Sequence, residues 1–135
     1  MNFCHYDPRR FFLFGIRIFF GIWLLYAGFV KWIFIGSHAF VGFITADFDK
    51  TWSPHVLNVA LAWLILCAEP LLALWILSGK KARAAWSSTT LLMFLLTLGQ
   101  TILMKPEVIY NWHYVILTLA CAALSEPQMT ASTTK

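Results

Sequence analysis

The sequence has few charged residues for its length. Only 12% of its 135 residues are Asp, Glu, Lys or Arg, whereas 60% are hydrophobic. An ordinary soluble domain carries about twice that share of charge. Ten Lys and Arg residues outnumber six acids, but these cations lie mainly at the ends of apolar runs, where they orient membrane helices. This distribution argues against a nucleic-acid partner and indicates a protein of the lipid bilayer.

The chain also lacks the sequence motifs of disulfide scaffolds, zinc sites and common hydrolases. Its cysteines are Cys4, Cys67 and Cys121, which show no CxxC and no ligand spacing. There is no Ser–His–Asp arrangement, no glycine-rich phosphate loop and no pair of acids at hydrolytic spacing. We therefore expect no metal and find no evident cofactor motif, and the sequence leaves any catalytic residue unknown.

Histidines are few, and the relevant ones fall at the ends of apolar runs. His38, His55 and His113 map to one side of the expected membrane. They could bind a metal or give a proton to a quinone, but three unrelated interfacial histidines explain the pattern more simply. Haem ligation would need two histidines facing each other within the bundle, so a cytochrome is not expected.

Long apolar runs make up most of the chain. Each is close to the ~20 residues that cross a hydrocarbon core as a helix. We predict an all-α fold, with a single membrane domain over residues 1–135. The domain is expected to be a four-helix bundle that ends in a polar tail. The expected spans and tail are about residues 11–35, 56–78, 84–104, 108–125 and 126–135.

The connection over residues 36–55 is the longest between two spans. Its middle, residues 39–44, is apolar but too short to cross a bilayer. It is expected to lie along the interface or to dip into the membrane as a short helix, and the sequence does not decide between a re-entrant helix and a loop.

The distribution of Lys and Arg predicts the orientation of the bundle. Six of these residues fall on one side and three on the other, so both termini are expected in the cytoplasm. We expect the chain to be a multi-pass protein of a cell membrane, such as a bacterial inner membrane. The six are Arg9, Arg10, Lys80, Lys81, Arg83 and Lys135, and the three are Lys31, Lys50 and Lys105.

Tryptophans near the ends of the spans are predicted to anchor the helices at the membrane interfaces. Trp32, Trp52 and Trp112 would do so on the outer side and Trp86 on the inner side.

Two charged residues, Arg17 and Glu69, lie within expected spans, where an unpaired charge is costly. Counting from Arg10 and from Lys80 at 1.5 Å per residue places both in the cytoplasmic half, within about 6 Å in depth. We predict that they form a buried ion pair. Such a pair could lock the helices together or serve a proton, quinone or ligand, and an unpaired, protonated Glu69 is a third possibility.

A stripe of small and charged residues runs along the first span. Arg17, Gly21, Leu24, Gly28 and Lys31 recur at steps of four and three. This spacing places them on one helical face, and the glycines allow another backbone to approach closely. The stripe is predicted to be a packing face rather than a lipid-facing one.

The last span contains a short polar cluster, Asn111-Trp112-His113-Tyr114. It is the densest polar group expected on the outer side and is a candidate site.

Two segments carry a family resemblance. The run from Arg17 to Lys31, with its spaced glycines, resembles the opening helix of the DoxX-like membrane proteins. Glu69-Pro70 and the basic turn over residues 79–83 are similar to the second helix of that family and the turn after it. The resemblance covers about residues 10–100, and the positions that match the family are Arg17, Lys31 and Glu69.

The resemblance implies a four-helix membrane protein linked to redox chemistry. Relatives include the small quinone-reactive subunit of thiosulfate:quinone oxidoreductases and partners of thiol-redox systems. The expected function is therefore an accessory or anchor subunit of a quinone-linked membrane complex, with the bilayer and other membrane subunits or a second copy as partners. The candidate binding residues are Arg17, Glu69 and Lys31, which match the family, together with His113 from the polar cluster of the last span.

Two alternatives stay open. The bundle itself could be an enzyme that oxidises a small substrate and passes electrons to quinone. It could also be a small transporter or channel that uses the Arg17–Glu69 site. Many transporters are built from internal repeats, and four spans without such a repeat argue against this alternative.

Overall fold

The structure is a computed structural model that describes residues 8–105 and 108–125. Every regular element within these residues is helical, which confirms the all-α expectation. The expected polar tail, residues 126–135, lies outside the described residues. The elements are α1 (Pro8–Phe29), the π-helix η1 (Val30–Gly36), α2 (Ser37–Phe48), α3 (His55–Ser78), α4 (Ala82–Ile102) and α5 (Val108–Leu124).

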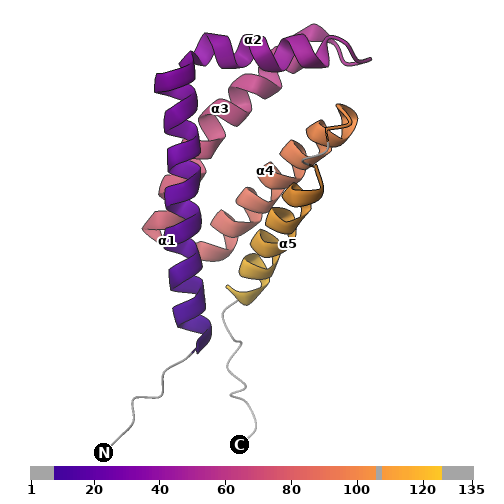
Figure 1. Cartoon of the computed structure of the whole chain (residues 1–135). Helices are drawn as coiled ribbons and strands as arrows, with labels where there is room; N and C mark the ends of the chain where they lie inside the picture. Colours follow the sequence, from indigo (N-terminus) through magenta and orange to yellow (C-terminus); the bar gives the residue numbers. More distant parts are fainter. Residues whose placement is uncertain (1–7, 106–107, 126–135) are drawn as a thin grey trace, which may run out of the picture.

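The helices form two layers that meet at one end of the molecule. α1 stands beside α3, which runs back against it, while α4 and α5 form an antiparallel hairpin (Figure 1). α2 turns away from α1 and crosses the end of the molecule above α3 (Figure 1). The start of α1 and the end of α5 lie toward the end of the molecule that is opposite α2 (Figure 1). There, Arg9 Nε donates a 2.7 Å hydrogen bond to the Leu124 carbonyl.

The ends of the expected spans agree closely with the ends of the helices. α1 with η1, α3, α4 and α5 each begin and end within three residues of the predicted bounds. Gly79 ends α3 with a φ of +70°, a conformation that suits a residue without a Cβ atom. That each of these helices crosses a bilayer stays a prediction.

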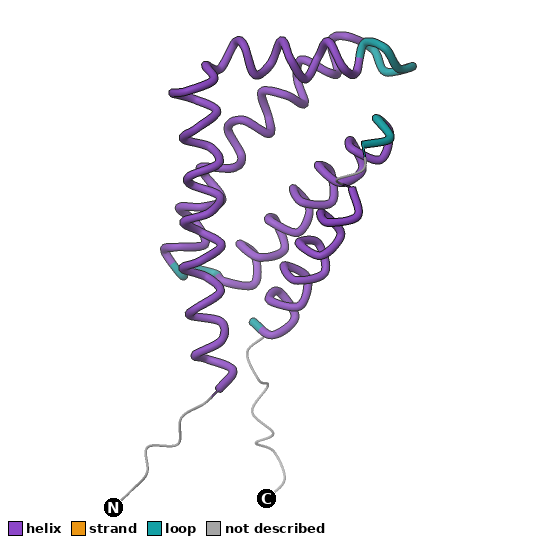
Figure 2. The backbone as a smooth tube through the Cα atoms, viewed as in Figure 1, coloured by secondary structure: helices purple, strands orange, loops and turns teal. Residues whose placement is uncertain are grey.

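The long connection after the first span is helical over most of its length. Residues 37–48 form α2, and the turn from Asp49 to Pro54 then leads into α3 (Figure 2). Gly36, with a φ of +84°, lets the chain change direction between η1 and α2. The expectation of a short helix is therefore confirmed, and the loop alternative is wrong.

α1 and α3 pack through the glycine stripe. Gly21, Leu24 and Gly28 are buried in this contact. A Cβ atom on Gly28 would lie 3.1 Å from Pro70 Cδ, and one on Gly21 would lie 2.6 Å from Leu77 Cγ. This close approach confirms that the stripe is a packing face.

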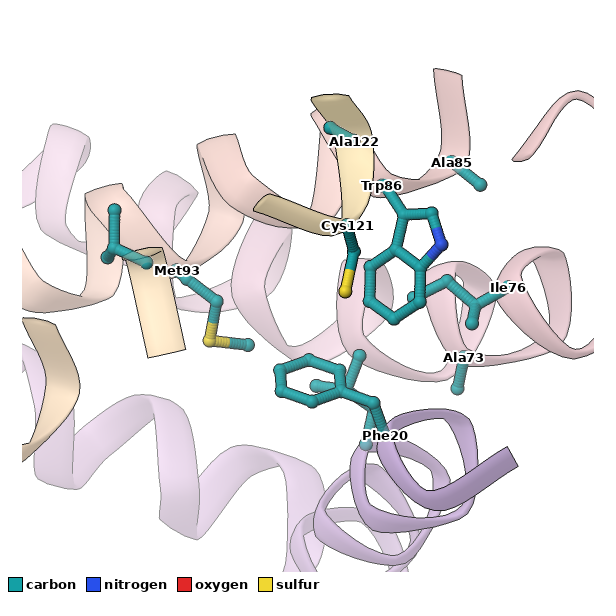
Figure 3. Close-up of a cluster of buried hydrophobic side chains, with 10 residues drawn as sticks. Phe20, Ala73, Ile76, Ala85, Trp86, Met93, Cys121 and Ala122 are labelled. Atoms are coloured by element: carbon teal, nitrogen blue, oxygen red, sulfur yellow. The ribbon is translucent and has the colours of Figure 1, made fainter. Parts of the chain in front are cut away.

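The apolar core lies where α1, α3, α4 and α5 meet. Phe20 and Trp86 point toward one another, with Cys121 beside them (Figure 3). The two rings have centroids 5.9 Å apart and planes inclined by 59°. Trp86 is only 2% exposed, so its predicted role as an interfacial anchor is wrong. Its large ring instead fills the space between the helices.

Many large apolar side chains lie on the outside of the molecule. Large apolar side chains such as Tyr26 and Phe34 are 66% and 76% exposed, while Thr89 and Thr97 are fully buried. Both threonines donate to the carbonyl four residues earlier, at 2.9 and 2.7 Å, so their hydroxyls are satisfied within their own helix.

Among the described residues, two helical stretches are long and apolar enough to cross a membrane. They are Pro8–Phe48 and His55–Ser78, and a shorter apolar stretch covers Asn111–Leu124.

Candidate ligand site at a buried ion pair

Glu69 lies in α3 among apolar side chains and is 3% exposed. Lys31, from η1, donates a hydrogen bond from Nζ to Glu69 Oε1, which makes a charged pair between two helices. The predicted Arg17–Glu69 pair is therefore wrong, because the partner of Glu69 is the other cation of the same stripe.

The register between α1 and α3 explains the correction. Gly28 lies against Pro70, which places the next turn of the first helix beside Glu69. Arg17 instead lies against Gly79, ten residues further along α3, or about 15 Å. The prediction assumed that Arg10 and Lys80 lie at the same depth in the membrane. In the structure, nine residues of α1 precede Arg17, and Arg17 itself lies at the level of Gly79, where α3 ends.

Arg17 has a different environment from the one predicted. Its guanidinium carbon lies 5.3 Å from the centre of the Phe14 ring, a cation–π contact within the same helix. Its Nε atom is buried and has no hydrogen-bond partner within residues 8–105 and 108–125. Arg17 thus belongs to the end of the α1–α3 contact and not to the site around Glu69.

A cavity of about 190 Å³ opens beside the ion pair. It lies between α1, η1, α3, α4 and α5, and its walls combine the charged pair with two amides and several apolar side chains. Its lining residues are Trp23, Leu24, Ala27, Lys31, Glu69, Met93, Leu96, Thr97, Gln100 and Asn111.

The two amides that line this cavity bond to each other. Asn111 Nδ2, from α5, donates to Gln100 Oε1 of α4. Trp23 supplies an aromatic wall and is held by stacking on Tyr114, with ring centroids 5.0 Å apart and planes inclined by 23°.

Only one of the two carboxylate oxygens of Glu69 has a hydrogen-bond partner among the described residues. Its Oε1 atom accepts from Lys31, whereas Oε2 is buried and has no hydrogen-bond partner among the described residues. A buried polar atom without a partner is costly. Glu69 also lines the cavity, so its carboxylate lies beside any hydrogen-bond donor that the cavity holds.

A second, mainly apolar cavity of about 260 Å³ lies between α2, α3 and α4. Its walls include Ile44, Leu61, Ile65 and Leu103. Leu96 and Gln100 of α4 line both cavities, so the two spaces adjoin.

The polar cluster of the last span divides between two faces. Asn111 lines the cavity and Tyr114 packs on Trp23, because residues three apart share one face of a helix. Trp112 and His113 are exposed on the other face. His113, a predicted binding residue, is therefore not brought to the Lys31–Glu69 pair.

The other histidines also lie apart from the pair. His38 contacts the Trp63 ring edge-on, with centroids 5.6 Å apart, and His55 Nδ1 lies 2.7 Å from Asp49 Oδ2. Within the described ranges, no three His, Cys, Asp or Glu side chains come together in a way that could hold a metal ion.

The sequence did not predict the bond between Gln100 and Asn111 or the role of Trp23. Gln100 lies three residues after Thr97 and shares its polar side of α4, which was a usable signal. Trp23 lies between Gly21 and Leu24 of the glycine stripe, and nothing in the sequence indicated that it would line a cavity.

Comparison of the chain with protein-family models, with curated proteins and with solved structures finds no match. The DoxX-like resemblance therefore stays a prediction that depends on the residues quoted for it.

Proposed function

We propose that the chain is a four-span membrane protein with both termini in the cytoplasm. The exposed aromatic side chains and the buried threonines support a lipid-facing exterior. The start of α1 and the end of α5 lie at one end of the bundle, as an even number of crossings requires. The excess of Lys and Arg at that end supports its placement in the cytoplasm.

Within this setting, we propose that the chain is an accessory subunit of a membrane redox complex and holds a quinone-type molecule beside Lys31 and Glu69. One observation carries the proposal: a carboxylate that is 3% exposed bonds through one oxygen only, while its other oxygen has no partner among the described residues. A pair that served only to lock helices would be expected to satisfy both oxygens, because the energy of a buried pair depends on it.

The lining of the cavity fits the head group of a quinone. Its volume of about 190 Å³ is below the ~300 Å³ of pockets for drug-sized ligands, so a single ring suits it better than a whole lipid. Lys31 and Asn111 offer donors for a ring oxygen, and the indole of Trp23 offers an aromatic wall. A bound quinone would supply two-electron chemistry, and the residues of this chain would hold and orient it.

The experiment is purification of the tagged chain from its native membrane in a gentle detergent. Mass spectrometry identifies co-purifying proteins, and solvent extraction followed by chromatography measures bound quinone. We expect redox subunits in stoichiometric amounts. We also expect a smaller amount of bound quinone in Asn111→Ala than in the wild type, because this change removes a hydrogen-bond donor from the cavity. Gly15→Ala is a matched control, because a Cβ atom there meets nothing within 4 Å.

Recovery of the chain alone and without quinone would contradict the proposal. Quinone reduction by the purified chain alone would favour the enzyme alternative. Substrate flux in liposomes that is lost in Glu69→Gln would favour a transporter.

A further inference from the structure

The two adjoining cavities differ sharply in chemistry. One contains the ion pair and the two amides, and the other is mainly apolar. On α3, Glu69 lines the first and Ile65, one helical turn earlier, lines the second. On α4, Leu96 and Gln100 belong to both, so a molecule could extend from one cavity to the other along these two helices.

We infer that the two cavities form one site for an uncharged amphiphile, whose hydroxyl-bearing head donates to the Glu69 carboxylate and whose hydrocarbon tail lies between α2, α3 and α4. This inference rests on the proposed function, namely that the cavity beside Lys31 and Glu69 binds a small molecule, and it names the class of that molecule.

The carboxylate of Glu69, which lines the polar cavity, sets the chemistry of the head. A carboxylate oxygen can only accept a hydrogen bond, so the ligand must bring the donor. A hydroxyl group does this, whereas the carbonyl of an oxidised quinone cannot. The site should therefore prefer a hydroquinone, or another hydroxyl-bearing head, to the corresponding quinone.

The charges of the lining argue for a neutral ligand. Lys31 and Glu69 compensate each other, and the other residues that line the polar cavity are uncharged. In the apolar cavity the one charged lining residue is Lys105, which bonds to Asp47 at 2.8 Å. A charged head would thus enter the polar cavity without a counter-ion, at a high cost.

The volumes set the division between head and tail. The polar cavity, at about 190 Å³, has room for one ring, and the apolar cavity, at about 260 Å³, gives space for a hydrocarbon chain. Each methylene buried there should increase affinity about fourfold, from the free energy of transferring one methylene out of water.

The test is anaerobic isothermal titration calorimetry of the purified full chain in detergent. The probes are an alkyl hydroquinone with a ten-carbon tail, its oxidised quinone, the tail-free hydroquinone and a ten-carbon alcohol. For the wild type we expect the alkyl hydroquinone to bind at least tenfold more tightly than the alkyl quinone.

Two variants make the assignment specific. In Glu69→Gln, Lys31 would still bond to the side-chain oxygen, so the amide group would present a donor to the cavity. The preference should then reverse in favour of the quinone. Ile65→Trp should weaken both alkyl compounds and leave the tail-free hydroquinone unchanged, whereas Gly15→Ala should match the wild type.

Equal binding of the oxidised and reduced forms, or the same preference in wild type and Glu69→Gln, would overturn the inference while leaving a small-molecule site in place. Absence of binding by every probe to the wild type would overturn the proposed function as well. Binding of the alcohol as tight as that of the alkyl hydroquinone would support the hydroxyl-headed class and identify a lipid alcohol, rather than a hydroquinone, as its source.

Discussion

At the scale of single residues, Asp49 organises the turn between α2 and α3. Its Oδ1 atom accepts a 2.9 Å hydrogen bond from Asn58 Nδ2, and its Oδ2 atom lies 2.7 Å from His55 Nδ1. Asn58, which is buried, also accepts a 2.6 Å bond from the Ser53 hydroxyl. The hydrogen bonds from Asn58 and His55 hold the pKa of Asp49 below its ordinary value of 3.8. The bond from Asn58 lowers this pKa more than the bond from His55.

This lowered pKa predicts acid sensitivity. Because Asp49 binds its proton less readily in the folded state than in the unfolded state, its contribution to stability is present above about pH 4. The contribution is lost as the pH falls through 3.8 toward the lower folded value. We expect the unfolding temperature in detergent to fall less steeply between pH 6 and pH 3 in Asp49→Asn than in the wild type. Identical slopes would show that the Asp49 bonds do not stabilise the turn.

At the scale of elements, the contact between α1 and α3 depends on the absence of side chains at two positions. Gly28 lies against the rigid ring of Pro70, and Gly21 lies against Leu77. Since the ring cannot rotate away, the spacing of the helices at Gly28 is fixed by backbone and ring atoms. This spacing also sets which residues of η1 reach Glu69.

Gly28→Ala tests this packing. The added Cβ atom would lie 3.1 Å from Pro70 Cδ, so the helices must separate slightly. We expect a loss of about 1–3 kcal/mol from overpacking, offset by at most about 1 kcal/mol of improved helix propensity. The free energy of unfolding in detergent, followed by circular dichroism, measures the difference.

Gly15→Ala is the matched control, because the same change there meets nothing within 4 Å. It should leave stability unchanged or raise it by up to about 1 kcal/mol. If both variants have the same stability, close approach at Gly28 does not hold α1 against α3.

The sequence was sufficient to predict the helices but not their register. Gly79 and Lys105 mark helix ends through local chemistry, so the ends were predicted to within three residues. The partner of Glu69 depends on how far α1 slides along α3, which is set by the contact of Gly28 with Pro70. The π-helix that carries Lys31 also has no sequence signature, because its bonding differs from that of an α-helix by a single residue.

At the scale of the whole molecule, the unequal distribution of Lys and Arg between the two ends predicts the orientation of the bundle in the bilayer. Lys50, in the turn after α2, should face the outside, and Arg83, at the start of α4, should face the cytoplasm. In a variant whose native cysteines are replaced by alanine, Lys50→Cys should react with an impermeant thiol reagent added to intact cells. Arg83→Cys should react only after the membrane is opened. The reverse pattern would invert the orientation, and labelling of both in intact cells would contradict four crossings.

The Lys31–Glu69 pair, on which the site depends, is tested most directly by double-mutant cycles on the free energy of unfolding in detergent. Glu69→Leu alone should cost about 3–5 kcal/mol, because it leaves the Lys31 ammonium without its partner. Adding Lys31→Met should recover most of that loss. Arg17→Met should simply add to Glu69→Leu, because the two residues lie about 15 Å apart along the helices. Coupling of Glu69 to Arg17, together with additivity for Lys31, would contradict the site described above.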